Sequence, residues 1–333
     1  MVLGTTLIVV LGASLAHAFR SLNCSTSFFE IQESVDQHKP LSLIDDSLST
    51  GILKAYASSC EADRETGALI VDIGSNKGST LLRYFTIWSN LEDVLLRKWY
   101  HSQDMFEFDK GKHLLSAPQV YALDPLKSAE IMTKKLIVDF QLTGFLHFDA
   151  LAMSNTTGTV HMYLPQKRGR VDEGGQVETG SVLSQWRDRG GLKVDGINMT
   201  TLDNFLQAKE LHEKEITFLK IDVEKLDFLV IKGASRVFDK QLVHLGQYEY
   251  IRGAIDLIEI TLWLKQRGYA SYVLWGHRKL LRLDGLSTDA IKQVGDKIAQ
   301  LNILFARIKD RCVSKALVTY VGEATLFPYK CFH

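Results

Sequence analysis

The sequence predicts an α/β fold with a mostly parallel sheet of seven strands, helices on both faces and an antiparallel hairpin at one edge. The first observation is a stretch from Gly67 to Phe85 that passes from a short apolar run through a glycine turn into a helical pattern. The second is that further apolar runs alternate with helical segments along the chain. This alternation is typical of parallel strands joined by crossover helices.

The stretch from Gly67 to Phe85 is predicted to contain a ligand-binding turn between its strand and its helix. Its apolar run, Ala68 to Ile73, contains three β-branched residues, as expected for a strand buried on both faces. The turn Gly74 to Gly78 reads G-S-N-K-G, and a helix is predicted from Ser79. Backbone N–H groups collect at the start of such a helix, and glycine lets a ligand approach them closely. A ligand is therefore expected at the carboxyl end of the strand, with a tight turn that binds nothing as the alternative.

The glycine spacing and a neighbouring acid bear on the kind of ligand. The dinucleotide fingerprint is G-x-G-x-x-G, whereas this turn has G-x-x-x-G with Asp72 two residues before its first glycine. A carboxylate at that point repels a pyrophosphate but attracts a cationic or amine-bearing ligand. The turn therefore favours S-adenosylmethionine over a nicotinamide dinucleotide.

The other predicted elements follow from short apolar runs and from helical periodicity. Strands are predicted for 119–123, 145–150, 159–164, 216–221 and 243–249, and a closing hairpin for 270–275 with 279–283. Helices are predicted for 30–35, 48–58, 79–99, 126–140, 201–206, 228–234, 255–267 and 287–308. The segment 159–164 is expected to form a hairpin with the segment before it. A polar insertion is expected at 101–118 and a charged loop at 165–180.

Acidic residues follow several of these strands. Asp124 ends the second strand, where nucleotide-binding folds place an acid that accepts ribose hydroxyls; capping the next helix is its alternative role. Asp149, at the end of the third strand, is a candidate for the adenine amino group. Asp222, Glu224 and Glu249 are predicted at the carboxyl ends of the fourth and fifth strands. If these three converge, repulsion raises one pKa toward neutrality, as a catalytic base requires.

Other roles are open for the same three carboxylates. Asp222 has the sequence position of a helix cap, and Glu249 could pair with a surface lysine or arginine. A divalent metal on the trio is a further alternative, but no histidine accompanies the three acids. We therefore expect no metal site.

Several blocks of the sequence resemble the FkbM-type methyltransferases, which use S-adenosylmethionine. In order, the blocks are LIVDIGSNKGSTLL, VYALDP, TLDNFL and ITFLKIDVEKLDFLVIKGA, followed by a strand that ends at Glu249. The resemblance covers roughly Ala68 to Trp275 and implies a Rossmann-like methyltransferase fold. The chain departs from the family pattern at Lys225, where the family usually has glycine, and at Asp227, where it usually has glutamate.

The resemblance implies an O-methyltransferase that acts on a hydroxyl of a sugar, glycan or small metabolite. The transfer would be in line, and a carboxylate base would assist it. The resemblance implies that Asp72, Gly74, Asn76 and Gly78 hold the methionine part of the cofactor and that Asp124 holds its ribose. Ser75 of the turn and Asp149 complete the predicted cofactor-binding residues. The resemblance also implies that Asp222 and Glu224 face the transferring methyl group and the acceptor, and Glu249 is the third predicted catalytic residue. Two other functions remain open: an inactive binding or scaffold protein that keeps this fold, and a nicotinamide oxidoreductase.

Composition limits the partners and the domain organisation. The 333 residues include 39 Lys and Arg and 39 Asp and Glu, so the chain lacks the basic excess that favours nucleic-acid binding. The expected partner is a hydroxylated small molecule or a glycan. We expect a helical preamble over 19–66, a methyltransferase domain over 67–285, and a C-terminal helix and tail over 286–333.

Residues 1–18 are predicted to be a signal peptide or an N-terminal membrane anchor, with a buried first helix as the third alternative. Val2 to Leu15 carries no charge, and Ala16-His17-Ala18 matches a signal cleavage site. Glycosylation sequons begin at Asn23, Asn155 and Asn198. These features predict the secretory pathway, either the lumen of the endoplasmic reticulum or Golgi or secretion, with or without a membrane tether.

The four cysteines lie near the two ends of the chain, and their spacing fits no metal site. They are Cys24, Cys60, Cys312 and Cys331. One arrangement pairs Cys24 with Cys60 and Cys312 with Cys331, and another ties the N-terminal segment to the C-terminal tail. Four free thiols in a reducing compartment are the alternative.

Overall fold

The computed structural model of the chain describes residues 47–60, 67–76, 78–88, 117–164, 192–275, 279–297 and 300–321. The predicted signal peptide or anchor, the helix 30–35, the insertion from 101 to 116 and the loop 165–180 lie outside these residues, as do Asn23, Cys24 and Cys331. Among the helices that are described, none combines the length and the apolar character that a membrane span requires.

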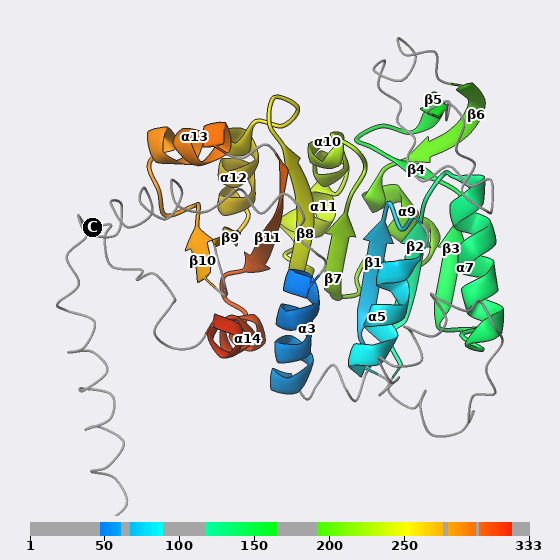
Figure 1. The fold of residues 1–333 in the computed structure, drawn as a ribbon, viewed down its shortest axis with the longest axis horizontal. Coiled ribbons are helices and arrows are strands. Elements are labelled where there is room, and N and C mark those ends of the chain that lie inside the picture. The colour runs from blue at the N-terminus through cyan, green and yellow to red at the C-terminus, as the bar shows by residue number, and fades with distance from the viewer. Residues whose placement is uncertain are drawn as a thin grey trace, which may run out of the picture.

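Eight strands of the described chain form one sheet, one more than the predicted seven (Figure 1). Five of them run parallel in the order β8-β7-β1-β2-β3. Their bounds are β1 (Leu69–Ile73), β2 (Gln119–Leu123), β3 (Leu146–Asp149), β7 (Ile216–Ile221) and β8 (Val243–Ile251). Antiparallel strands continue the sheet beyond β8 in the order β11-β9-β10: β9 (Tyr269–Trp275), β10 (Lys279–Arg282) and β11 (Gln300–Arg307). The α/β class, the parallel strands and the closing hairpin are confirmed.

β11 is the additional strand, and the prediction for its segment was wrong. The sequence predicts one helix over 287–308, but the structure has helix α13 (Thr288–Lys297) followed by β11. β11 lies between β8 and β9 and pairs with both. Residues 303–306 are apolar because both faces of the strand are buried, and such a short run does not distinguish a strand from a helix. The sheet therefore extends past residue 285, the predicted end of the domain.

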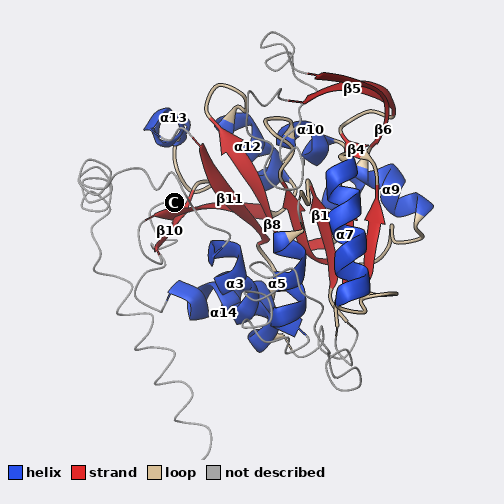
Figure 2. Ribbon diagram, turned by 45° about the vertical axis from the view of Figure 1, so that its right-hand side comes forward, coloured by secondary structure: helices blue, strands red, loops and turns tan. Residues whose placement is uncertain are grey.

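Helices cover both faces of the sheet over two hydrophobic cores (Figures 1 and 2). One face carries α3 (Ser47–Ser59), α5 (Ser79–Trp88), α7 (Lys127–Asp139) and α14 (Arg311–Val321). The other face carries α9 (Leu202–Ala208), α10 (Asp227–Lys232), α11 (Ser235–Asp239), α12 (Leu257–Gln266) and α13. Successive strand residues point to opposite faces, so Ile70 joins the first core and Val71 the second. This is why the central strands are mostly apolar, with Asp72 on β1 and Lys220 on β7 as buried exceptions.

A small second sheet lies beyond one end of the main sheet, near α7 (Figures 1 and 2). Its order is β4-β6-β5, with β4 (Ala152–Met153), β5 (Gly158–Leu164) and β6 (Leu192–Thr200). Met162 on β5 packs against Leu126 and Ala129 at the start of α7. The predicted strand 159–164 is confirmed, but its predicted partner was wrong. β5 pairs antiparallel with β6, a strand absent from the prediction, because β6 inserts between β5 and β4.

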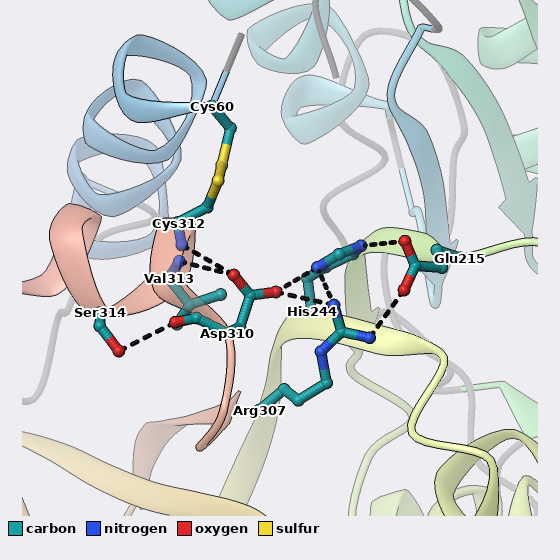
Figure 3. The surroundings of a disulfide bond; sticks show 8 residues. All are labelled: Cys60, Glu215, His244, Arg307, Asp310, Cys312, Val313 and Ser314. Atoms are coloured by element: carbon teal, nitrogen blue, oxygen red, sulfur yellow. Dashed lines mark hydrogen bonds and ion pairs between the residues drawn. A yellow bond between two sulfur atoms is a disulfide. The ribbon is translucent and has the colours of Figure 1, made fainter. Parts of the chain in front are cut away.

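A disulfide between Cys60 and Cys312 joins the end of α3 to the start of α14 (Figure 3). The two cysteines are 252 positions apart, so the arrangement that ties the N-terminal segment to the C-terminal part is the one observed. Beside the disulfide, Asp310 accepts the Cys312 N–H and pairs with Arg307 over 2.9 Å and with His244 on β8. The two helices are thereby fixed to each other and to the sheet.

Candidate active site

The turn after β1 is packed tightly against the neighbouring strands. The Gly74 N–H donates to the Leu123 carbonyl over 2.8 Å, and the Asp222 N–H donates to the Ile73 carbonyl over 2.9 Å. Gly74 has a φ of +79°, and a Cβ there would lie 1.8 Å from the Asp222 carbonyl oxygen. Glycine is therefore required both by the backbone conformation and by the space. The turn brings the carboxyl ends of β1, β2 and β7 together.

Asp124, directly after β2, is held in place by two backbone groups. The Asn76 N–H donates to its Oδ2 over 2.9 Å, and the Leu126 N–H donates to its Oδ1 over 2.8 Å. Burial raises the pKa of Asp124, although these two hydrogen bonds act in the opposite direction. The N-cap of α7 is Leu126, so Asp124 does not take the alternative role of cap residue. Asp124 joins the glycine turn to the start of α7.

A cavity of about 230 Å³ lies between these strand ends and the small sheet. Most of its polar lining comes from the loops after strands of the main sheet, and Ser154 follows β4 of the small sheet: Gly74, Asn76, Asp124, Ser154, Asp222 and Glu224. Its apolar lining includes Leu126, Leu151, Met153, Met162, Met199 and Leu229. The methionines come from β4, β5 and β6. Sequence reasoning missed them because no motif marks them and β6 was not predicted.

The three predicted catalytic carboxylates lie close enough together to affect one another. Asp222 and Glu224 line the cavity, whereas Glu249, on β8, is not part of its lining but interacts electrostatically with both. Burial and the negative charge of Asp222 raise the pKa of Glu249 to about 7, although Gln300 Nε2 donates to its Oε1. Burial and Asp222 also raise the pKa of Glu224. The expected repulsion is present, and Glu249 has a pKa suited to a general base at neutral pH.

Asp227, one of the two departures from the family pattern, lies beneath this group. It is fully buried, and its Oδ1 accepts the Glu249 N–H over 3.1 Å. Its Oδ2 has no hydrogen-bond partner among the described residues. Burial, followed by the charge of Asp222, raises the pKa of Asp227 well above its ordinary value, which favours the neutral carboxyl. Asp227 thus fixes the backbone of Glu249 from the core side.

Asp72 does not reach the cavity. Its side chain is fully buried behind the glycine turn. Its Oδ2 accepts the Tyr84 hydroxyl over 2.9 Å, and its Oδ1 lies 3.7 Å from Lys220 Nζ. In this arrangement Asp72 supports the turn from behind, and the predicted contact with a cofactor would have to be indirect.

Three more predicted cofactor residues, Ser75, Gly78 and Asp149, also lie outside the cavity lining. The Gly78 N–H donates to the Ser75 carbonyl, and a Cβ on Gly78 would lie 2.6 Å from the Leu136 side chain. These two residues shape the turn and let α5 approach α7. Asp149 ends β3 and pairs with Lys209 over 2.8 Å. Its proposed contact with adenine stays a prediction.

Lys220 is a buried charged residue next to the turn that was not among the predicted site residues. It lies within β7 and is 4% exposed. Its Nζ lies 3.1 Å from Asp222 Oδ2 and 3.4 Å from the Gly74 carbonyl oxygen. The signal was a lysine inside an otherwise apolar strand, because a buried ammonium requires partners.

A comparison with models of known protein families matches residues 72–271 to the FkbM methyltransferase domain. The match covers more than half of the chain and includes the end of β1 and all of β2, β7 and β8. The chain belongs to the FkbM methyltransferase family. Membership places it among the S-adenosylmethionine-dependent methyltransferases, as the sequence blocks predict. No curated protein matches the sequence.

Three solved structures are similar to the chain at low sequence identity. FkbM from Methylobacillus flagellatus KT is 14% identical with a TM-score of 0.39, and the alignment covers 83% of this chain and 57% of that chain. TrmK from M. capricolum, solved with S-adenosylhomocysteine, is 10% identical with a TM-score of 0.32 and coverages of 78% and 68%. Human methyltransferase 10 domain containing protein is 9% identical with a TM-score of 0.34 and coverages of 79% and 82%. The chain thus spans less than two thirds of the first of these.

The backbone shows why the FkbM family usually has glycine where this chain has Lys225. The φ of Lys225 is +81°, a conformation that costs a side-chain-bearing residue about 1–2 kcal/mol. We expect Lys225→Gly to stabilise the fold by about 0.5–1 kcal/mol, since glycine also gains entropy in the unfolded chain. Urea unfolding measures the change.

Lys240→Gly is the matched control for this substitution. Lys240 is also a surface lysine in a turn, but its φ is −79°. The same chemical change there relieves no strain and should destabilise the fold. A Lys225→Gly protein that loses as much stability as the control would contradict the strain argument.

Proposed function

We propose that this FkbM methyltransferase binds S-adenosylmethionine in the cavity and methylates a hydroxyl of a sugar, a glycan or a small metabolite. The observation that carries the proposal is one cavity lined by the glycine turn, the buried Asp124 and the carboxylates Asp222 and Glu224. The turn and Asp124 are neighbours because the Asn76 N–H donates to Asp124. A nucleoside site and a catalytic carboxylate site therefore share one wall.

The lining fits the chemical parts of the proposed cofactor. Asp124 is a fixed carboxylate that can accept ribose hydroxyls. Leu126, Met153 and Met162 offer an apolar surface for a flat purine. Asp222 adds negative charge, which suits a sulfonium and an amine. When bound, S-adenosylmethionine supplies an electrophilic methyl group on a cationic sulfur.

The carboxylates supply the proton chemistry that an alcohol acceptor needs. An alcohol is a weak nucleophile unless a base takes its proton in the transition state, which contributes about 10²–10⁴-fold. The pKa of Glu249 is raised to about 7, first by burial and then by Asp222. Its basic form therefore becomes more abundant as pH rises through about 7, and the rate should rise with it.

We further propose that the protein acts in the secretory pathway. The Cys60–Cys312 disulfide supports this, because disulfides persist in oxidising compartments. Asn155 and Asn198, which begin two glycosylation sequons, are exposed on and beside the small sheet. Glycan release followed by mass spectrometry of the secreted protein should show both asparagines modified. Unmodified asparagines and free cysteine thiols would contradict the compartment but not the enzymatic proposal.

Calorimetric titration with S-adenosylhomocysteine tests the enzymatic proposal. Residues 19–333, produced by secretion, should bind S-adenosylhomocysteine in the micromolar range and should not bind NADH. Transfer of a labelled methyl group to sugars and glycans would then identify the acceptor. A folded protein that binds no S-adenosylhomocysteine would contradict the proposal. Binding without turnover on any acceptor would favour the inactive scaffold.

A further inference from the structure

Lys220 is the buried cation at the centre of the acidic groups around the turn. On adjacent strands, Lys220 lies opposite Asp72 in the register of β7 and β1. Its Nζ lies 3.1 Å from Asp222 Oδ2, 3.4 Å from the Gly74 carbonyl oxygen and 3.7 Å from Asp72 Oδ1. A buried ammonium is stable only with such partners, so its position is fixed by all three.

These contacts connect the core to the edge of the cavity. Asp72 is fully buried and is itself held by the Tyr84 hydroxyl on α5. Asp222 lies at the other end of the series, with its side chain 40% exposed and in the cavity lining. Lys220 therefore links a carboxylate that cannot meet a ligand to one that can.

The surroundings of Glu249 differ from those of Asp222. Among the described residues, its side-chain hydrogen-bond partner is the neutral amide of Gln300 on β11. The charges that act on it come from Asp222 and Glu224 after β7 and from Lys220 on β7, and the buried carboxyl of Asp227 on α10 accepts its backbone N–H. Asp222 has a direct ion pair with a buried lysine, and Glu249 has none among the described residues.

We propose that Lys220 is a positioning residue that gives Asp222 and Glu249 different roles. Its ion pair engages Asp222 together with the glycine turn, and Glu249 is left as the carboxyl group that exchanges a proton with the acceptor. The inference rests on the proposed function, and it adds which acid is the base and which residue makes it so. The raised pKa of Glu249, which is caused first by burial and then by the charge of Asp222, agrees with these roles.

The titration of Glu249 in the full secreted chain tests the inference without a methyl acceptor. Carbon-13 NMR of labelled glutamate carboxyls, assigned with Glu249→Gln, should give a midpoint of about 7 in the wild type. Lys220→Met removes a positive charge, so the midpoint should move to higher pH. Lys220→Arg keeps the charge and should return it toward the wild-type value. Lys209→Met, which breaks the ion pair to Asp149, is the control and should leave it unchanged.

A second measurement, the affinity for S-adenosylhomocysteine, tests whether Lys220 stabilises the glycine turn. S-adenosylhomocysteine affinity should fall roughly tenfold in Lys220→Met, because a charged hydrogen bond to the Gly74 carbonyl is lost. If Lys220→Met does not fold, Asp222→Asn replaces it. Removing that negative charge should lower the Glu249 midpoint.

Two results would overturn the inference. One is a wild-type Glu249 that titrates like an ordinary glutamate, and the other is a midpoint that does not respond to folded Lys220 and Asp222 variants. Failure of the proposed function is a separate result, since a wild-type protein that binds no S-adenosylhomocysteine can still show the Glu249 titration.

Discussion

Asp124→Ala lowers the affinity for S-adenosylhomocysteine by about 100-fold or more in the calorimetric titration. The carboxylate is fixed by the N–H groups of Asn76 and Leu126, so its remaining lone pairs have one orientation toward the cavity. Two hydrogen bonds from ribose hydroxyls to a charged acceptor contribute about 1.5–3 kcal/mol each. Alanine removes both and also leaves two backbone N–H groups without their acceptor, which loosens the turn.

Asp124→Asn separates the loss of negative charge from the loss of the hydrogen-bond acceptor, and Asp239→Asn is the control. Asparagine at 124 keeps one carbonyl acceptor but no charge, so its loss of affinity should be smaller, roughly tenfold. Asp239 is an exposed acid on α11 that pairs with Arg267 over 2.8 Å, and its replacement should have no effect on binding. An Asp124→Ala protein that is folded and binds as tightly as the wild type would reduce Asp124 to a structural residue of the turn.

Acidification should weaken the same interaction. Burial raises the pKa of Asp124, so the carboxylate is protonated at a higher pH than an ordinary aspartate. A protonated carboxyl group is a weaker acceptor of hydrogen bonds from hydroxyl groups than a carboxylate is. The affinity of the wild type should therefore fall as pH decreases, and the affinity of Asp124→Asn should change less over the same range.

The parallel half of the fold could be predicted because its physical signals are local. β1, β2 and β7 are short and mostly apolar runs, since helices cover the sheet on both faces. β11 could not be predicted, because an apolar run after α13 fits a helix equally well until its partners β8 and β9 are known. β6 carries the polar sequence LKVDGINMT, and its pairing with β4 and β5 depends on segments distant in sequence.

The residues of the candidate site likewise differ in how far the sequence predicts them. Asp124, Asp222 and Glu224 follow strands directly, so the rule that ligands bind at the carboxyl ends of strands finds them. Asp72 precedes the turn in sequence, which predicts a contact with the cofactor, and the register places it opposite Lys220 in the core. The part played by Lys220 depends on that register and has no counterpart in the linear pattern.

Gly74→Ala should be the most damaging single substitution at the turn, with a loss of stability of about 3 kcal/mol or more. The φ of Gly74 is +79°, which alone costs alanine about 1–2 kcal/mol. The added Cβ would lie 1.8 Å from the Asp222 carbonyl oxygen, and a backbone atom cannot move away as a flexible side chain can. Overpacking of this kind adds about 1–3 kcal/mol. Urea unfolding measures the loss.

Gly253→Ala isolates the two contributions, because Gly253 has the same φ of +79° and open space around its missing Cβ. It should lose only the conformational part, about 1–2 kcal/mol. The difference between the two variants is then the steric cost of separating the β1 turn from the end of β7. Since Asp222 moves with that strand end, Gly74→Ala should also lose S-adenosylhomocysteine binding, whereas Gly253→Ala should retain it. Equal losses of stability in the two variants would show that the turn yields without moving Asp222.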